Sequence, residues 1–440
     1  MIAAKRLYLL LMATGVLLCF TPFFRELARV AVVIDIVLLI AVIVDYLLTP
    51  RSYLLSADRE VAERLSIGRA NPVLIRVKNV GGSDLLLKLR DSVPDALYPD
   101  KREFEFRMGA GSELTFKYAL FPTRRGPYEL GDIYLRYLSF LGLFWRQTRV
   151  PAQIKIRVLS DLKALTDLSI KLSSSTELGE LHQRKRGQGT DFASLREYVT
   201  GDDPRSIDWK ATARRHRPIV RTYEAEQEQK LLVLIDAGRM MVSEVGRLTR
   251  FDHALNAGLS LALTGLTYND QVGFGIFADK PLLYMPARRG KDYFKKIVDA
   301  TSGVEPRMIE PDYAGMLAHF ATLQKTRALF VVLTDLTDPS GSQMLLSGLA
   351  HLGKRHLAFC VTLKDRRIQQ LAQAPDDGRT TRAGKLDIFK RAVAVDLLQQ
   401  RELALNVLKK QGCLVLDEAP EELSTRLIDS YLEIKRKALL

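Results

Sequence analysis

Two aspartates, Asp236 and Asp335, lie at the ends of apolar runs, residues 231–235 and 328–333, that are typical of strands buried on both faces. Because the carboxyl ends of parallel strands meet at one edge of a sheet, the two side chains are expected to converge there. Two carboxylates could hold Mg²⁺ through a few oxygens and water molecules. A metal-dependent hydrolase or metal-mediated binding protein using Asp236 and Asp335 is therefore one hypothesis.

A second candidate site is the charged segment at residues 189–224, in which four aromatic side chains lie among nearly balanced acids and bases. Guanidinium groups pair with carboxylates through two parallel hydrogen bonds and also stack on aromatic faces. The pattern predicts an ordered polar network that either docks a partner or braces neighbouring domains. Its candidate residues are Arg196, Glu197, Tyr198, Asp202, Asp203, Arg205, Asp208, Trp209, Arg221 and Glu224.

Within this segment, Arg196, Arg205 and Arg221 are expected to bridge the nearby carboxylates. The expected acceptors are Glu197, Asp202, Asp203 and Glu224. Residues 201–205 predict a tight turn, in which Gly201 permits a positive φ. Residues 208–214 predict a short helix with Asp208 at its N-terminus, where a negative charge is favoured.

Other patterns do not indicate catalysis. Gly273-Phe274-Gly275 lies inside a predicted strand and lacks the Gly-Lys-Ser/Thr ending of a phosphate-binding loop. The six histidines have no metal-ligand spacing, and the three cysteines form neither a disulfide framework nor a zinc pattern. No nucleophile–base pair is recognisable. We therefore expect a protein without enzymatic activity or cofactor.

The two aspartates belong to a stretch in which strand and helix patterns alternate, from about residue 229 to residue 440. This alternation predicts a doubly wound parallel α/β sheet of the Rossmann type. Residues 51–160 instead contain short alternating segments separated by glycine-rich turns, which predict a β-sandwich. Residues 161–228 connect the two and carry the charged segment.

Residues 7–24 and 30–48 are almost wholly apolar, and each is about as long as a membrane-crossing helix. We expect a two-helix transmembrane hairpin over residues 1–50. A cleaved signal peptide is the alternative. The sequence counts against it, because a small-x-small cleavage site is missing and a second apolar run follows the first at once. The flanking cations predict that the soluble domains face the cytoplasm. These cations are Lys5, Arg6, Arg51, Arg59 and Arg64.

Two acids lie in the second apolar run. Asp35 could be protonated, pair with Arg29, or mark a contact between the helices. Asp45 lies near the interfacial end of the run and is given no special role. The net charge of +14 indicates an anionic neighbour. Because the basic clusters are scattered and lack interleaved aromatic residues, membrane lipid is favoured over nucleic acid.

The opening of the α/β unit resembles von Willebrand factor type A domains. Their metal site begins with a buried strand ending in Asp-x-Ser-x-Ser, followed by a later threonine and a later aspartate. Here the first element reads Asp236-Ala237-Gly238-Arg239-Met240, so Gly238 and Met240 replace both serines. The position resembling the threonine falls at about Pro311. Only the two aspartates remain, and we expect Mg²⁺ to be absent.

The charged segment as a whole resembles the bacterial family named domain of unknown function fifty-eight. The matching residues are Gly189, Asp191, Phe192, Leu195-Arg196-Glu197-Tyr198, Gly201-Asp202-Asp203-Pro204-Arg205, Ile207-Asp208-Trp209-Lys210-Ala211, Ala213-Arg214, Arg221 and Tyr223-Glu224. The resemblance implies a membrane anchor, a β-sandwich and a von Willebrand A-like domain. It implies no catalytic activity, and a MoxR-type AAA ATPase as partner.

Together these patterns predict four parts: a transmembrane hairpin (1–50), a β-sandwich (51–160), a motif segment (161–228) and a von Willebrand A-like domain (229–440). The leading hypothesis is an adaptor in the bacterial inner membrane that presents the last domain to a MoxR-type ATPase and a client protein in the cytoplasm. Nucleic acid is not an expected partner.

Overall fold

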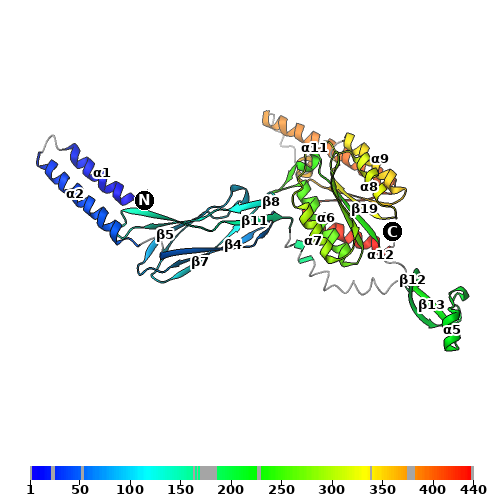
Figure 1. Ribbon diagram of the computed structural model, residues 1–440. Coiled ribbons are helices and arrows are strands. Elements are labelled where there is room, and N and C mark those ends of the chain that lie inside the picture. Colours follow the sequence, from blue (N-terminus) through cyan, green and yellow to red (C-terminus); the bar gives the residue numbers. More distant parts are fainter. Residues whose placement is uncertain are drawn as a thin grey trace. The chain divides into compact units, whose positions relative to one another are not determined.

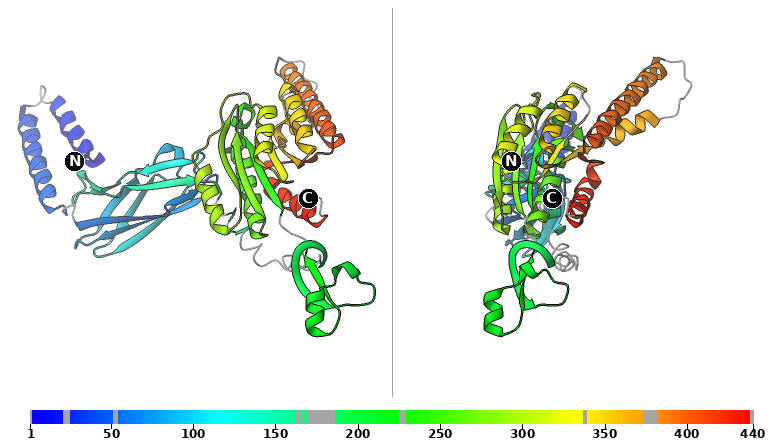
Figure 2. Two further views of the ribbon diagram at one scale, coloured as in Figure 1. Left: turned by 45° about the vertical axis from the view of Figure 1, so that its right-hand side comes forward. Right: turned by 90° about the vertical axis from the view of Figure 1, so that its right-hand side faces the viewer.

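The computed structural model describes residues 2–20, 25–50, 54–161, 164–165, 167–168, 186–224, 229–336, 339–373 and 382–437. Within these ranges, the side chains of residues 25–28, 186–194, 222–224, 339–342 and 382–387 are left out of the description. The chain divides into two compact units, Met1–Leu159 and Ser160–Leu440. Figures 1 and 2 show the helices and strands of each unit.

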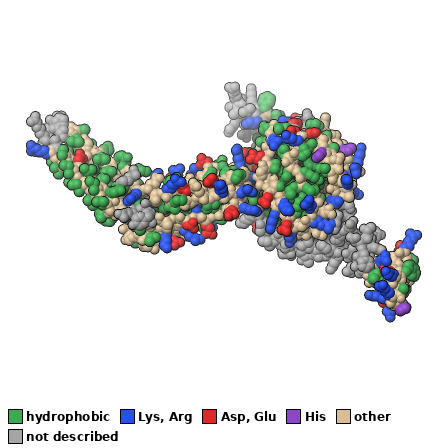
Figure 3. Space-filling view, viewed as in Figure 1, with side chains coloured by type: hydrophobic (Ala, Val, Ile, Leu, Met, Phe, Trp, Pro, Cys, Tyr) green, Lys and Arg blue, Asp and Glu red, His purple; other side chains and the backbone are tan. Residues whose placement is uncertain are grey.

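The first unit begins with a short strand and two helices: β1 (Ile2–Ala3), α1 (Lys5–Cys19) and α2 (Arg25–Leu48). Residues Arg29–Leu48 of α2 form the one helix of the described chain that is long and apolar enough to cross a membrane. Helix α1 has 15 residues and is shorter than the predicted run 7–24. Residues 21–24 of the predicted run lie outside the described residues. Apolar side chains cover the visible face of both helices (Figure 3).

Antiparallel strands make up the rest of this unit. They are β2 (Leu55–Val61), β3 (Arg64–Ser66), β4 (Asn71–Asn79), β5 (Leu85–Asp91), β6 (Glu103–Met108), β7 (Glu113–Leu120), β8 (Gly126–Leu130), β9 (Ile133–Leu138), β10 (Phe144–Val150) and β11 (Ile154–Leu159). A short 3₁₀ turn, η2 (Asp95–Leu97), follows β5. The strands form sheets of order β1-β10-β9-β5-β6, β2-β4-β7 and β3-β11-β8, the last containing one parallel pair, β3 with β11.

The first two of these sheets face each other across a common core. Phe116 of β7 lies with its ring centroid 5.3 Å from that of Phe104 and 4.3 Å from that of Phe106, both on β6. Arg59 of β2 is buried and donates to Asp91 of β5 at 2.6 Å. Its assignment as a cation flanking the membrane span is therefore wrong, because its position on β2 turns the side chain into the core. The predicted strands within residues 73–78, 85–89, 104–107, 114–120 and 154–158 are confirmed.

The second unit contains a six-stranded sheet of order β18-β17-β14-β19-β20-β21. Its strands are β14 (Lys230–Asp236), β17 (Gln271–Phe277), β18 (Pro281–Arg288), β19 (Leu329–Thr334), β20 (Leu357–Leu363) and β21 (Leu414–Glu418). Strand β18 runs antiparallel to β17, so the prediction of a wholly parallel sheet is wrong at this edge. The short connection from Phe277 to Pro281 explains it, because a parallel partner needs a long crossover.

Helices cover both faces of this sheet. They are α6 (Arg250–Thr267), α7 (Lys291–Thr301), α8 (Tyr313–Leu323), α9 (Pro339–Gly353), α10 (Arg366–Gln373), α11 (Arg382–Lys410) and α12 (Pro420–Arg436). On one face, Leu232 and Leu234 join a buried cluster with residues of α8, α9 and α11. On the other, Val233 and Ile235 lie against Gly258 of α6. Helix α6 starts at a capping box formed by Thr249 and Asp252.

Two glycines of β17 have a packing role. A Cβ atom at Gly273 would lie 2.5 Å from the Leu232 side chain, and one at Gly275 would lie 2.7 Å from Leu234. Close packing with the neighbouring strand thus explains the Gly-Phe-Gly sequence. Two short strands, β15 (Glu244–Val245) and β16 (Leu248–Thr249), and the 3₁₀ turn η4 (Arg239–Val242) lead from β14 into α6.

Residues 186–224 form a small structure of their own, here called the arm. Strands β12 (Arg186–Glu197) and β13 (Ile219–Glu224) pair antiparallel, and η3 (Pro204–Ser206) and α5 (Trp209–Arg215) lie between them. Gly201 has a φ of 114°, as the predicted turn requires. Asp208 caps α5 by accepting from the backbone amides of Lys210 and Ala211, both at 3.0 Å. The predicted short helix is thus confirmed.

Candidate functional site

Asp236 ends β14 at the carboxyl edge of the six-stranded sheet and is fully buried. Its Oδ1 accepts from the Gly238 amide at 2.7 Å, and its Oδ2 accepts from the hydroxyls of Tyr313 and Thr334, each at 2.7 Å. Desolvation raises the pKa of the Asp236 carboxyl, and the three hydrogen bonds oppose that rise. Each oxygen of this carboxyl group therefore already accepts from the protein.

Asp335 follows β19 at the same edge and forms ion pairs with two arginines. Its Oδ1 accepts from the Leu336 amide at 2.8 Å and from Nη1 of Arg401 at 2.7 Å. Its Oδ2 pairs with Nη1 of Arg250, the first residue of α6. The side chains of all three charged residues are less than one tenth exposed. Two guanidinium groups thus occupy the directions from which a metal ion would approach this carboxylate.

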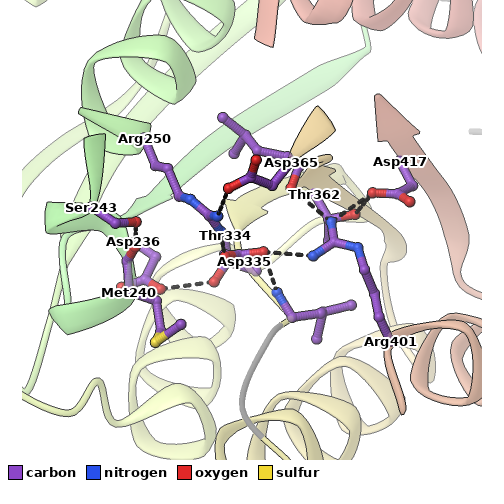
Figure 4. A network of polar contacts seen from close by, with 12 residues as sticks. Asp236, Met240, Ser243, Arg250, Thr334, Asp335, Thr362, Asp365, Arg401 and Asp417 are labelled. Atoms are coloured by element: carbon purple, nitrogen blue, oxygen red, sulfur yellow. Dashed lines mark hydrogen bonds and ion pairs between the residues drawn. The ribbon is translucent and has the colours of Figure 1, made fainter. Parts of the chain in front are cut away.

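The same arginines reach two further aspartates at the ends of the next strands. Arg250 donates to Asp365 at 3.0 Å, and Arg401 donates to Asp417 at 2.6 Å. Thr362 also donates to Asp417, at 2.8 Å. Figure 4 shows the resulting chain of contacts from Arg250 through Asp335 to Arg401 and Asp417. We call these five side chains, Arg250, Asp335, Asp365, Arg401 and Asp417, the carboxyl-edge network.

The residues at this edge do not fit a divalent metal ion. Mg²⁺ needs oxygen ligands in near-octahedral geometry. Gly238 and Met240, at the positions where a von Willebrand A-type metal site has serines, offer no side-chain oxygen. A Cβ atom at Gly238 would lie 2.8 Å from Cδ of Pro311 and 3.0 Å from Oδ1 of Asp236. A serine at this position would therefore clash with the ring of Pro311, which has no side-chain oxygen to offer a metal ion. In the described ranges, no group of three or more His, Cys, Asp or Glu side chains is arranged to hold a metal ion.

Sequence reasoning placed Asp236 and Asp335 at this edge but missed the residues that bind them. Asp365 and Asp417 could have been found, because each lies at or just beyond the end of an apolar strand, as Asp236 and Asp335 do. Arg401 lies in the middle of the long helix α11, 66 residues from Asp335, and no local pattern marks it. Tyr313 was recognised only as the start of a helix.

In the arm, two ion pairs that we call the clasps join residues distant in its sequence. Arg196 donates through both terminal nitrogens to Asp202, at 2.7 and 2.6 Å. Arg221 donates through Nε to Asp208 at 2.8 Å. The paired arginine lowers the pKa of each of these aspartates, and it is the largest cause in both. The bidentate form of the first clasp fixes the turn at residues 199–202, because Asp202 also accepts from the Val199 amide at 2.9 Å.

The clasps agree only in part with the predicted pairings. Arg196 bridges one of its expected carboxylates, whereas Arg221 pairs with Asp208, which was expected only to cap a helix. Glu197 pairs at 3.2 Å with Arg217, which was not among the candidate residues. Asp203 accepts from the backbone amide of Arg205, in the geometry of a turn. The side chain of Glu224 and those of Phe192 and Tyr223 lie outside the described residues.

The outer surface of the arm presents apolar side chains. Trp209, at the first position of α5, is 71% exposed, and Val199 is 62% exposed. Leu195 of β12 is exposed as well, whereas Ile219 and Val220 of β13 are buried. Tyr198 is half-buried. An exposed tryptophan on a frame held by ion pairs has the composition of a protein interface, where tryptophan and arginine are enriched.

Three comparisons relate the chain to known proteins. Residues 194–412 match the family model described as "Protein of unknown function DUF58". Uncharacterized proteins of Mycobacterium tuberculosis and Mycobacterium bovis are each 23% identical over 192 residues, which cover 43% of this chain and 60% of theirs. The match thus spans less than two thirds of the relatives' length.

Among solved structures, the CARDB domain of a Pyrococcus furiosus protein is 16% identical and covers 26% of this chain and 97% of its own, with a TM-score of 0.20. An MSP family member of C. elegans is 12% identical and covers 24% and 97%, with a TM-score of 0.16. At these scores the likeness carries no argument about the chain.

Proposed function

The chain carries a DUF58 family domain at residues 194–412, and from this premise we propose that the protein is a non-enzymatic adaptor anchored in the bacterial inner membrane. In this proposal α1 and α2 cross the membrane as a hairpin. The β-sheets of the first unit and the whole second unit then lie in the cytoplasm, where the arm binds a MoxR-type AAA ATPase and thereby brings it to a client protein. The exposed Trp209 on the clasped arm is the observation that carries the proposal.

Two features of the second unit support a von Willebrand A-like domain in this role. The sheet order places the strands, numbered along the chain from β14, as 3-2-1-4-5-6, which is a doubly wound order with its ligand edge at the carboxyl ends. At that edge, Asp236 and Asp335 accept from protein donors: a tyrosine, a threonine, backbone amides and two arginines. We infer that the edge has become a structural element, with cationic side chains in place of a metal ion.

The alternative, a metal-dependent hydrolase or metal-mediated binding protein, receives less support from this geometry. Both arginines would have to leave Asp335 before a cation could bind it, and separating a buried pair costs on the order of 3–5 kcal/mol. The serine and threonine hydroxyls of the family site are also missing. Docking through the arm needs no such rearrangement.

Docking is also favoured over bracing by the contacts of the arm. Its clasps join arm residues to one another, Arg196 to Asp202 and Arg221 to Asp208. A brace between domains would instead use its arginines on carboxylates of the neighbouring domain. The fixed frame lowers the cost of ordering on binding, because the turn and α5 are already in place.

The test is binding of a purified MoxR-type AAA ATPase from the same organism to the full-length protein in nanodiscs. Truncation of an interface tryptophan that is a hot spot costs about 2 kcal/mol or more. Trp209→Ala should therefore raise the dissociation constant by roughly 30-fold. Phe389→Ala is the matched control, since Phe389 of α11 is 70% exposed, and it should leave affinity unchanged.

Two results would contradict the proposal: wild-type protein that fails to bind the ATPase with or without nucleotide, or equal affinity for wild type and Trp209→Ala. Circular dichroism and thermal unfolding of each variant control for folding. Trp209 is exposed, and its substitution leaves Asp208 in place as the cap of α5. The substitution should therefore leave the unfolding temperature of the protein nearly unchanged.

A further inference from the structure

The loop that joins β9 to β10, residues 139–143, contacts the base of both N-terminal helices. We propose that this loop is a third membrane contact, whose Phe140 and Leu141 insert into the interfacial layer of the bilayer beside the hairpin. The inference rests on the proposed membrane anchoring. It adds that the sandwich itself binds lipid at a defined site.

Helix α2 fixes the loop through Asp45, which is fully buried although it lies in an otherwise lipid-exposed helix. The carboxylate accepts from the Ser139 hydroxyl at 2.5 Å and from the amides of Leu141 and Leu143 at 2.6 and 3.3 Å. Thr49, one turn later, accepts from the Phe140 amide at 3.3 Å. Three of the loop amides, those of Phe140, Leu141 and Leu143, are thereby satisfied by Asp45 and Thr49. The other two, of Ser139 and Gly142, donate to backbone carbonyls, so all five amides have partners close to lipid.

The start of α1 holds the other side of the loop. Strand β1 pairs with β10 through Ile2 with Trp145 and Ala3 with Phe144, and the Ala4 amide donates to Leu143 at 2.9 Å. Gly142 has a φ of 78°, and a Cβ atom there would lie 3.0 Å from Nη1 of Arg6. The loop is therefore fixed between the first turn of α1 and the last turns of α2.

Clamped in this way, the loop presents apolar side chains outward. Phe140 is 66% exposed and Leu141 is 41% exposed. They continue the apolar surface of the last turn of α2, where Leu47 and Leu48 are also exposed. Exposing such side chains to water is unfavourable, whereas burying them in the apolar part of a bilayer is favourable.

Nearby aromatic and basic side chains fit the polar boundary of a bilayer. The guanidinium carbon of Arg146 lies 5.5 Å from the ring centroid of Tyr46. Lys5 and Arg6 start α1 beside the loop. Tyrosine and tryptophan concentrate at membrane–water interfaces, and lysine and arginine on the cytoplasmic side. The bilayer is thus the occupant that this surface fits, because the loop is continuous with the apolar helices.

The experiment uses full-length protein in vesicles of phosphatidylcholine and phosphatidylglycerol with brominated acyl chains. Both native tryptophans, Trp145 and Trp209, are changed to phenylalanine, and one tryptophan is introduced at a time. Phe140→Trp reports on the loop, Leu39→Trp on the middle of α2, and Tyr98→Trp on an exposed turn. Tyr98 lies at the opposite end of the sandwich, since its neighbours Leu97 and Pro99 contact the end of β7 that pairs with Asn71 rather than Asn79.

We expect bromines near the glycerol backbone to quench the tryptophan at position 140 more than bromines near the chain ends, with the reverse order at position 39 and no quenching at position 98. Quenching at 39 without quenching at 140 overturns the loop contact while the anchor stands. No quenching at 39 overturns the anchor, and the loop contact with it.

A second measurement covers the case in which replacing Trp145 disturbs β10. In a Cys19→Ser background, Phe140→Cys carries a nitroxide, whose collision rate with oxygen should exceed that with a water-soluble nickel complex. Asp45→Ala should remove this preference by releasing the loop, whereas Asp35→Ala, elsewhere on α2, should retain it. If the nitroxide at position 140 is equally accessible to oxygen and to the nickel complex in the protein that retains Asp45, the proposal is wrong.

Discussion

At the scale of single residues, Asp236 and Asp335 have opposite electrostatic surroundings although both end strands at one sheet edge. Asp236 accepts only from neutral donors, so burial dominates and raises the pKa of its carboxyl. Asp335 lies between two buried arginines, each of which also pairs with a second aspartate, Asp365 or Asp417. Burial lowers the pKa of Arg250, which shows how unfavourable an unpaired cation would be there.

These surroundings predict different outcomes for two matched substitutions. Asp236→Asn should leave the free energy of unfolding at pH 7 unchanged or higher, because the amide can accept from Gly238 and donate to the two hydroxyls without a buried charge. Asp335→Asn should lower it by about 1.5–3 kcal/mol, because both arginines lose a charge-assisted hydrogen bond while each keeps one carboxylate partner. Urea unfolding of full-length protein in detergent measures both. A metal centre would instead show stabilisation of wild type by added Mg²⁺ and its loss in both variants.

The pH dependence follows from the sign of the Asp236 shift. A carboxyl whose pKa is higher in the folded state than in the unfolded state favours folding below the unfolded value of about 3.9. That contribution is lost as the pH rises through the folded value. The unfolding free energy of wild type should therefore fall, relative to that of Asp236→Asn, as the pH is raised from about 4. Parallel pH profiles for the two proteins would contradict this assignment.

At the scale of elements, the arm shows how a short, charged segment can hold a fixed shape without a large core. Few of its described side chains are buried, Ile219 and Val220 among them. The clasps and the Asp208 cap then contribute order that burial alone would not supply. Both clasped aspartates have lowered pKa values, so the clasps are complete above about pH 4 and are lost as the pH falls through the lowered values.

A spin label on the arm tests this acid transition. In a Cys19→Ser background, a nitroxide at Lys210→Cys should be immobilised at about pH 6. It should become mobile only as the pH falls below about 4 and through the lowered pKa of Asp208, when the cap of α5 is lost. The same label at Lys291→Cys in α7 is the control and should keep its line shape over that range. Equal mobility of the arm label at both pH values would show that the clasps do not order α5.

Sequence patterns predicted most of these elements, and the reasons for the exceptions are physical. The strands ending at Asp236 and near Asp335 are apolar along their whole length, which marks them without tertiary information. Strand β18 was not predicted, because its mostly half-buried residues do not alternate between two faces and because Pro281 and Pro286 disfavour a strand. Helix α10 was missed as well; it has eight residues, none of which is buried, and only Ile368 and Leu371 among them are large apolar side chains.

At the scale of the whole molecule, the topology of the chain in the membrane decides where the arm can act. In the proposed hairpin the start of α1 and the end of α2 both meet the sandwich. The start of α1 does so through β1, and the end of α2 does so through Asp45. Cys19, at the far end of α1, then lies at the opposite membrane face. The other two cysteines, Cys360 and Cys413, are buried, and burial raises the pKa of both thiols.

Cysteine labelling therefore measures orientation with little change to the protein. A membrane-impermeant maleimide should label Cys19 in intact spheroplasts of a bacterium expressing the wild-type chain, and Cys360 and Cys413 should stay unlabelled because thiolate is the reactive form. In Cys19→Ser, Lys291→Cys should react only after lysis. Labelling of Lys291→Cys in intact spheroplasts would reverse the orientation and remove a cytoplasmic ATPase as partner.

The sequence by itself determined the apolar helices, the alternating strands, the cap of α5 and the family motif, because each depends on residues close together in the chain. The tertiary structure alone decided the partners of the charged side chains. Arg401 meets Asp335 from 66 residues away, and Asp45 meets the amide of Leu143 from 98 residues away. Periodic burial produces a local pattern in the sequence. A buried charged residue indicates that a partner is needed but not which residue provides it.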